Sequence, residues 1–208
     1  MKFTLIIICL LAVTLHAQTA APAAKQAPKP KIAPTLANVP YGTHERQVLD
    51  FYKAASERPA PLLFFIHGGG WVNGDKANPG ELSACLDAGI SVVSINYRYS
   101  YQAQLAAVMP PVKWPLEDAA RALQFVRSKA ADWNIDKQRI GASGGSAGAC
   151  SSLWLAFHDD MADPQSSDPV ARESTRLWCA AVNGAQTSLD PKQCSVPHLD
   201  WTGDKLQN

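Results

Sequence analysis

Short uninterrupted runs of apolar residues recur along the middle of the chain. Pro61 to Ile66, Ser91 to Tyr97 and Leu177 to Asn183 are such runs, each with the length of a strand. An apolar run without polar alternation is typical of a strand buried on both faces, as in a parallel sheet covered by helices. Two further segments, Arg46 to Lys53 and Arg139 to Ser143, also have the composition of strands. The pattern therefore predicts several strands of one buried sheet.

Between these runs, apolar residues recur with the spacing of a helix. In the segment that begins at Pro115, the apolar positions three or four residues apart are Ala119, Leu123, Val126 and Ala130. Such positions share one helical face. Residues 78–88 and 147–158 also have helical patterns, whereas the charged, proline-containing segment 159–176 is expected to be a surface excursion. Strands alternating with helices form βαβ units, so the predicted class is α/β with a parallel sheet.

The first residues have the features of a secretory signal. Lys2 gives a positive start, Phe3 to Leu15 is a nearly unbroken apolar run, and Ala17 offers a small residue to a peptidase. We expect residues 1–17 to be a cleavable signal and the protein to be exported, to the periplasm or out of the cell. A membrane anchor is the alternative, but the run is shorter than the roughly 20 residues that span a bilayer.

Residues 18–40 are rich in alanine, proline and lysine and contain little that is large and apolar. We expect an extended tether there, followed by one domain over residues 41–208. Of the 19 basic residues, four precede Tyr41, where no acidic residue occurs, so the domain carries 15 basic residues against 18 acidic ones. Nucleic-acid partners are not expected, because proteins that bind them are usually basic. The sequence carries no signal for an oligomeric state.

A Gly-x-Ser-x-Gly motif, Gly144 to Gly148, lies between a predicted strand and a predicted helix. In that position the turn is so tight that side chains beside the serine would collide with neighbouring strands. Glycines therefore flank the serine, and its hydroxyl projects above the sheet. Ser146 is the candidate catalytic nucleophile. A glycine-rich turn containing serine also arises by chance. The pentapeptide alone therefore does not tell whether Ser146 is a nucleophile or only a turn residue.

A second glycine motif supports the first. His67-Gly68-Gly69-Gly70-Trp71 directly follows a predicted buried strand. Backbone N–H groups aimed at one point can bind an oxyanion, and side chains there would block the substrate. The expected donors of this oxyanion hole are Gly69, Gly70 and Ala147, the residue after the serine. A phosphate-binding loop is the alternative, but no lysine follows at the spacing of a P-loop.

With these two motifs in this order, the chain resembles an α/β-hydrolase of the carboxylesterase and hormone-sensitive-lipase-like group, which includes secreted esterases acting on esterified plant polysaccharides. The segments that carry the resemblance lie between about Arg46 and Leu189 and read HGGGWVNG (67–74), NYR (96–98), the helix bearing Asp118 and Ala122, and GGSAG (144–148). The resemblance implies a three-layer α/β-hydrolase fold with a mostly parallel sheet. It also implies hydrolysis of carboxylic esters, such as acetyl or feruloyl esters of polysaccharides, through an acyl-enzyme on Ser146, with His67 shaping its loop rather than transferring protons.

The resemblance stops before the rest of the catalytic machinery. Similar enzymes take their acid and then their histidine from loops after later strands, and each added strand with its helix needs about 30 residues. Since 25 residues follow Asn183, we expect a fold incomplete at its C-terminus, with the acid and histidine beyond residue 208. His158 lies about 18 Å from Ser146 along the predicted helix and is not expected to be the base. Asp190 and His198 follow in the right order, but without a strand between them they are expected to be turn and loop residues.

Two other functions stay open. The first is a catalytically silent binding or remnant protein that keeps the first half of the fold. The second is a serine peptidase of the prolyl-oligopeptidase type, which usually carries a large extra domain that does not fit here. No cofactor is expected, and no cluster of histidine, cysteine or carboxylate shows metal-ligand spacing, which disfavours a metal-dependent deacetylase. The expected partner is a small-molecule or carbohydrate ester.

Cysteines allow two interpretations. In an exported protein Cys179 and Cys194 could form a disulfide, whereas Cys85 and Cys150 lie in apolar helical patterns where cysteine acts as a small apolar residue.

A few other residues are also open to more than one role. Trp71 either lines a substrate pocket or belongs to the core. Asp75 and Lys76 are expected to fix the oxyanion loop or to lie in water, and Arg98 to form a structural ion pair. Phe157 is expected to pack inside.

Overall fold

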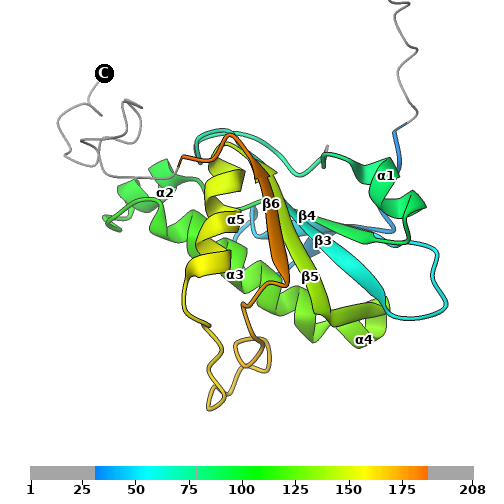
Figure 1. Cartoon of the computed structure of the whole chain (residues 1–208). Coiled ribbons are helices and arrows are strands. Elements are labelled where there is room, and N and C mark those ends of the chain that lie inside the picture. The colour runs from blue at the N-terminus through cyan, green and yellow to red at the C-terminus, as the bar shows by residue number, and fades with distance from the viewer. Residues whose placement is uncertain (1–30, 78, 187–208) are drawn as a thin grey trace, which may run out of the picture. The chain divides into compact units, whose positions relative to one another are not determined.

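The computed structural model describes residues 31–77 and 79–186 (Figure 1). Six strands form one sheet in the order β1-β2-β4-β3-β5-β6. The strands are β1 (Leu36–Pro40), β2 (Val48–Tyr52), β3 (Ala60–Ile66), β4 (Ser91–Ile95), β5 (Ile135–Gly145) and β6 (Cys179–Asn183). β4, β3, β5 and β6 run parallel to one another, whereas β2 is antiparallel to both β1 and β4. The sheet is therefore mostly parallel, as the apolar runs predicted.

Helices lie on both faces of the sheet, which gives the three layers of an α/β-hydrolase fold. They are α1 (Leu82–Asp87), α2 (Ser100–Leu105), α3 (Lys113–Ser128), α4 (Ala130–Trp133) and α5 (Ala147–Phe157). Phe64 of β3 is fully buried in a core that includes apolar residues of α3 and α5. Its neighbour Phe65 faces the other way, because side chains alternate along a strand, and approaches Gly80 just before α1.

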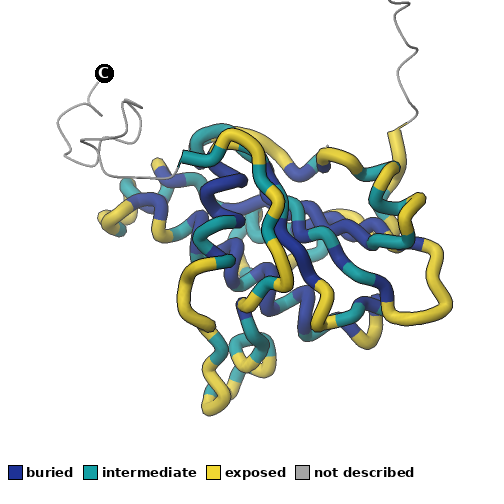
Figure 2. The backbone as a smooth tube through the Cα atoms, in the orientation of Figure 1, coloured by how far each residue is buried: buried dark blue, intermediate teal, exposed yellow. Residues whose placement is uncertain are grey.

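The core is densest in the middle of the sheet. Phe51 of β2 stacks on Trp133 of α4 with ring centroids 4.6 Å apart. Burial decreases toward β6, which lies at one edge of the described sheet and alternates between exposed and partly buried residues (Figure 2). The end of β3 at Ile66, beside the two glycine motifs, lies in this buried part of the sheet.

The prediction of a tether over residues 18–40 is wrong for its last part. Leu36–Pro40 is strand β1, and it pairs with β2 at the other edge of the sheet. The N–H of Asn38 also donates to the carboxylate of Asp50 at 2.8 Å. Sparse apolar residues and nearby prolines hid this strand, but an edge strand tolerates a terminal proline because one side of its backbone faces no other strand. The expected signal, residues 1–17, lies outside the described residues.

Some boundaries also differ from the expected ones. α1 begins at Leu82, β5 extends beyond Arg139 to Ser143 at both ends, and α2 was not expected. Phe157, expected to pack inside, is 83% exposed at the end of α5. The segment 159–176 contains no helix or strand, as expected. Within the described part of the chain, no helix is long and apolar enough to cross a membrane.

Candidate active site

The ends of β3 and β5 bring the two glycine motifs together. The two strands are neighbours, and Ile66 of β3 is the register partner of Gly144 of β5. Residues 67–74, here named the glycine loop, therefore leave the sheet beside the turn that carries Ser146. A Cβ placed on Gly68 would lie 3.6 Å from the Cβ of Ser146. This place, outside the carboxyl ends of parallel strands, is where open α/β sheets bind their ligands.

Ser146 occupies a strained turn between β5 and α5. Its backbone angles are φ 53° and ψ −120°, a conformation that costs a non-glycine residue about 1–3 kcal/mol. Its N–H donates to the carbonyl oxygen of Asn183 at 3.0 Å, and the residue is exposed. A Cβ on Gly144 would lie 2.4 Å from the carbonyl oxygen of Ile66, so only glycine fits there. This geometry is typical of a serine held above a sheet as a nucleophile.

Three backbone N–H groups near this turn are available to a ligand. Within the described residues, those of Gly69, Gly70 and Ala147 donate to no backbone carbonyl. Ala147 is the first residue of α5, and the first N–H groups of a helix have no partner inside it. The helix N-terminus also carries a partial positive charge, which favours an anion. Within the described residues, the three predicted oxyanion-hole donors therefore have no backbone acceptor, and Ala147 among them is buried.

His67 packs inside the glycine loop. Its ring stacks on Tyr97 with centroids 4.3 Å apart, and its Nδ1 lies 2.7 Å from the carbonyl oxygen of Gly68. Burial lowers the pKa of His67, and the positive charge of Arg46 adds to this, while the hydrogen bond to Gly68 and the charge of Asp75 oppose it. A neutral ring protonated at Nδ1 donates to Gly68. These contacts support a shaping role rather than proton transfer.

Arg46 and two tyrosines hold the glycine loop from outside, and sequence reasoning missed this function. The Nε of Arg46 donates to the carbonyl oxygen of Tyr97 at 2.8 Å, and one of its terminal nitrogens donates to that of Gly74 at 3.2 Å. The hydroxyl of Tyr99 donates to the same Gly74 oxygen at 2.6 Å. In the sequence, only the NYR segment, 96–98, pointed to Tyr97 as part of the family resemblance. Nothing in the sequence pointed to Arg46.

A buried ion pair fixes the chain just after the glycine loop. Lys76 Nζ lies 2.9 Å from an oxygen of Asp50 on β2, and the two side chains are each 8% exposed. The N–H of Lys76 donates to the side-chain oxygen of Asn96, whose amide nitrogen donates to Asp75. Burial alone would raise the pKa of Asp75, but the hydrogen bonds from Asn96 and Ala77 and two nearby cations lower it overall. Both residues expected to fix the loop therefore do so.

Trp71 and Arg98 have structural roles. The Trp71 side chain is fully buried, and its Nε1 donates to the hydroxyl of Ser151 in α5 at 3.0 Å. Of the two roles expected for Trp71, the structure therefore supports the role in the core. The Arg98 guanidinium pairs with Asp118 of α3 at 2.6 Å, the ion pair that the sequence predicted. Arg98 also lies over the Trp114 ring, with 4.2 Å to the ring centroid.

The structure does not bring a histidine base to Ser146 among the described residues. His158 lies at the far end of α5, where its ring contacts Trp154 at 4.3 Å. Asp190 and His198 lie outside the described residues, as does Cys194, so the alternative triad and the disulfide with Cys179 stay predictions.

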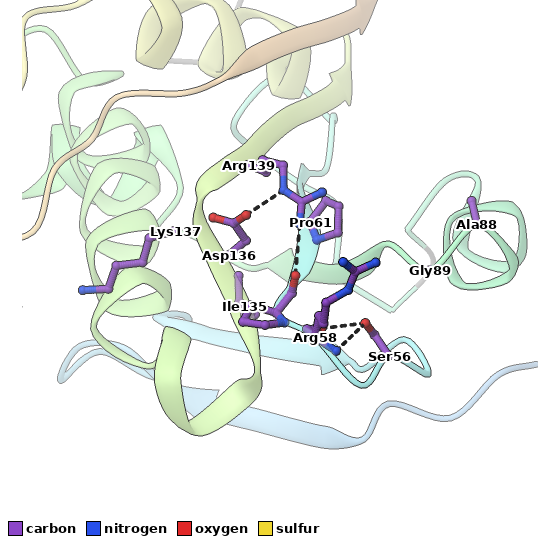
Figure 3. A pocket seen from close by; sticks show the side chains of 10 residues that line it. Ser56, Arg58, Pro61, Ala88, Gly89, Ile135, Asp136, Lys137 and Arg139 are labelled. Carbon is purple, nitrogen blue, oxygen red and sulfur yellow. Dashed lines mark hydrogen bonds and ion pairs between the residues drawn. The ribbon is translucent and has the colours of Figure 1, made fainter.

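A cavity of about 750 Å³ lies where β3, β4 and β5 begin, at the other end of these strands from Ser146. It is lined by residues that precede or begin β3, β4 and β5, including Arg58, Gly89 and Arg139 (Figure 3). Arg139 is held there by Asp136 and by the carbonyl oxygen of Pro59. Since α/β sheets bind ligands at the carboxyl ends of their strands, the size of this cavity does not outweigh the geometry around Ser146.

Residues 49–182, more than half of the 208-residue chain, match the family BD-FAE, an α/β-hydrolase family of esterases. The chain belongs to the BD-FAE family. The matched range contains the glycine loop, Ser146 and Ala147. All the residues of the expected nucleophile and oxyanion hole therefore lie inside the BD-FAE region.

Two named relatives of this BD-FAE chain are esterases. Gut esterase 1 of Caenorhabditis elegans is 30% identical over 171 residues, which are 79% of this chain and 30% of that protein. Esterase LipC of Mycobacterium tuberculosis (strain ATCC 25618 / H37Rv) is 34% identical over 167 residues, or 77% of this chain and 36% of LipC. An acetyl ester-xyloside bifunctional hydrolase from Caldicellulosiruptor lactoaceticus has a similar crystal structure, with a TM-score of 0.60 and 30% identity over 69% of this chain and 50% of that one. The BD-FAE chain spans about a third of the first two proteins and half of the third.

Proposed function

We propose that this protein is a carboxylic ester hydrolase with Ser146 as its nucleophile. The observation that carries the proposal is the exposed, strained Ser146 beside the three available N–H groups of Gly69, Gly70 and Ala147. The family and the named esterase relatives support the same reaction class.

In the proposed reaction, the Ser146 oxygen attacks the carbonyl carbon of the ester and loses its proton to a base. The three N–H groups stabilise the oxyanion, and each such donor typically contributes about 2.7–4 kcal/mol to transition-state stabilisation. The bond to the alcohol then breaks, the alcohol leaves with the proton, and the acyl group stays on Ser146. Water attacks this acyl-enzyme, which releases the carboxylic acid and restores the serine.

The reaction needs a histidine base and a carboxylate that orients it. Within the described residues no hydrogen bond joins Ser146 to a histidine side chain, so the proposal places both groups outside them. The second candidate, a catalytically silent protein with this fold, differs from the first in this point alone.

For the substrate, we propose acetyl or feruloyl esters of polysaccharides. The similarity to a hydrolase named for an acetyl ester and a xyloside supports this choice. The positive start and apolar run of residues 1–17 support an exported protein, periplasmic or secreted, which would meet such polymers.

The test is hydrolysis of p-nitrophenyl acetate by the full-length protein. We expect turnover by the wild type and by Ser143→Ala, a matched serine variant on β5 three residues before Ser146, and a rate no higher than buffer for Ser146→Ala. Equal rates for the wild type and Ser146→Ala would overturn the proposal. A folded wild type without turnover would favour the silent protein.

A further inference from the structure

A row of four aromatic rings leads from the glycine loop to the surface. The row consists of His67, Tyr97, Tyr99 and Tyr101, and its successive ring centroids are 4.3, 6.3 and 5.6 Å apart. Exposure increases outward from Tyr97, which is fully buried, to Tyr101, which is 45% exposed. The row therefore connects the candidate oxyanion hole to an open aromatic surface.

The outer end of the row is rigidly attached to the glycine loop. The N–H of Ser100, the first residue of α2, donates to the carbonyl oxygen of Trp71 at 2.8 Å. The Tyr99 hydroxyl bonds to Gly74, and the guanidinium carbon of Arg46 lies 3.8 Å from the Tyr99 ring centroid. Tyr101 is thus presented to solvent at a fixed position relative to the loop beside Ser146.

The polar groups at this end suit a ligand with many hydroxyls. Within the described part of the chain, no hydrogen bond involves the hydroxyl of Tyr101, which lies on the outermost ring of the row. An aromatic ring carries negative charge on its face, which attracts the slightly positive C–H groups of a sugar ring. An exposed ring with hydrogen-bonding groups beside it offers both contacts that a pyranose needs.

We propose that Tyr101 forms a distal subsite that stacks on a sugar ring of the polysaccharide chain whose ester reaches Ser146. This inference rests on the proposed function and names a residue that holds the polysaccharide chain away from the ester itself. The competing occupant is an aliphatic chain, since Leu105 and Met109 are 85% and 57% exposed beyond Tyr101. An aliphatic ligand would gain nothing from the Tyr101 hydroxyl, which is why the sugar is favoured.

Binding is measured by the retardation of the full-length protein in native gels that contain soluble xylan. We expect Tyr101→Ala and Tyr101→Leu each to weaken binding about fivefold, because both lose the ring. We expect Tyr101→Phe to weaken binding only about twofold, because it keeps the ring and loses the hydroxyl. Trp178→Ala removes an aromatic ring that is 68% exposed elsewhere, before β6, and serves as the matched control with unchanged binding. Thermal melts establish that every variant is folded.

Three results would overturn the proposal: no retardation of the wild type, unchanged binding by Tyr101→Ala, or unchanged binding by Tyr101→Leu, which would point to apolar docking. Ser146→Ala is expected to bind xylan normally. The two proposals therefore fail separately, since a protein that binds xylan through Tyr101 but hydrolyses no ester keeps the subsite and loses the proposed reaction.

Discussion

Gly148 lies so close to Ile66 that a Cβ at position 148 would be 2.0 Å from the carbonyl oxygen of Ile66. This contact sets how near α5 approaches the end of β3, and hence how near Ser146 lies to the glycine loop. The last glycine of the serine motif is therefore a packing requirement between two elements.

Replacing Gly148 by alanine should destabilise the protein by about 3 kcal/mol, because a backbone oxygen cannot move aside as a side chain can. Alanine in a helix is otherwise about 1 kcal/mol better than glycine, so the sign of the effect is diagnostic. Urea unfolding followed by circular dichroism measures it. Gly80→Ala is the control, since its Cβ would meet only the Phe65 ring at 3.6 Å. Equal stability of the two variants would contradict the account.

Replacing Gly69 by alanine tests the oxyanion hole. Gly69 has φ 103°, and a Cβ there would lie 2.3 Å from the carbonyl oxygen of Asn73. The loop must shift, so we expect kcat to fall about 100-fold with little change in KM, as when one oxyanion donor is lost. Hydrolysis of p-nitrophenyl acetate measures both constants, with Gly80→Ala as the reference. An unchanged kcat would remove Gly69 from the proposed site.

The Lys76 ion pair predicts a large effect on stability. Lys76→Met leaves the Asp50 carboxylate buried without its cation, and removing one partner of a buried pair typically costs about 3–5 kcal/mol. The pair Lys113 and Glu117, which is exposed and 3.8 Å apart, gives the matched control. Lys113→Met should cost less than about 0.5 kcal/mol. Urea unfolding measures the loss of unfolding free energy in each variant. Similar losses in the two would show that the buried pair does not stabilise the protein more than the exposed one.

Much of the sheet could be predicted from the sequence, because buried parallel strands appear as local apolar runs. The juxtaposition of the two glycine motifs followed from the same runs, since parallel strands end at one edge. β1 could not be predicted, because its stability comes from pairing with β2 and from Asp50, which are distant in the sequence. The same holds for Arg46, whose partners Tyr97 and Gly74 are distant in sequence.

His67 predicts a pH dependence of stability. Because the folded pKa of His67 is lowered from 6.5, mainly by burial, the unfolded chain binds its proton more readily. The contribution of neutral His67 to the free energy of unfolding is therefore fully present above pH 6.5, and it decreases as the pH falls below that value. We expect the melting temperature to fall between pH 7.5 and pH 5.5, and to fall less in His67→Asn. An equal fall in both proteins would show that His67 does not contribute.

The most direct test of the central claim is covalent labelling of the folded, full-length protein with a fluorophosphonate probe, followed by mass spectrometry of its peptides. An activated serine nucleophile reacts with this probe, whereas an ordinary surface serine does not. We expect one label per molecule, located on Ser146, and no label on Ser146→Ala. A folded wild-type protein that stays unlabelled, or that carries its label on another residue, would contradict it.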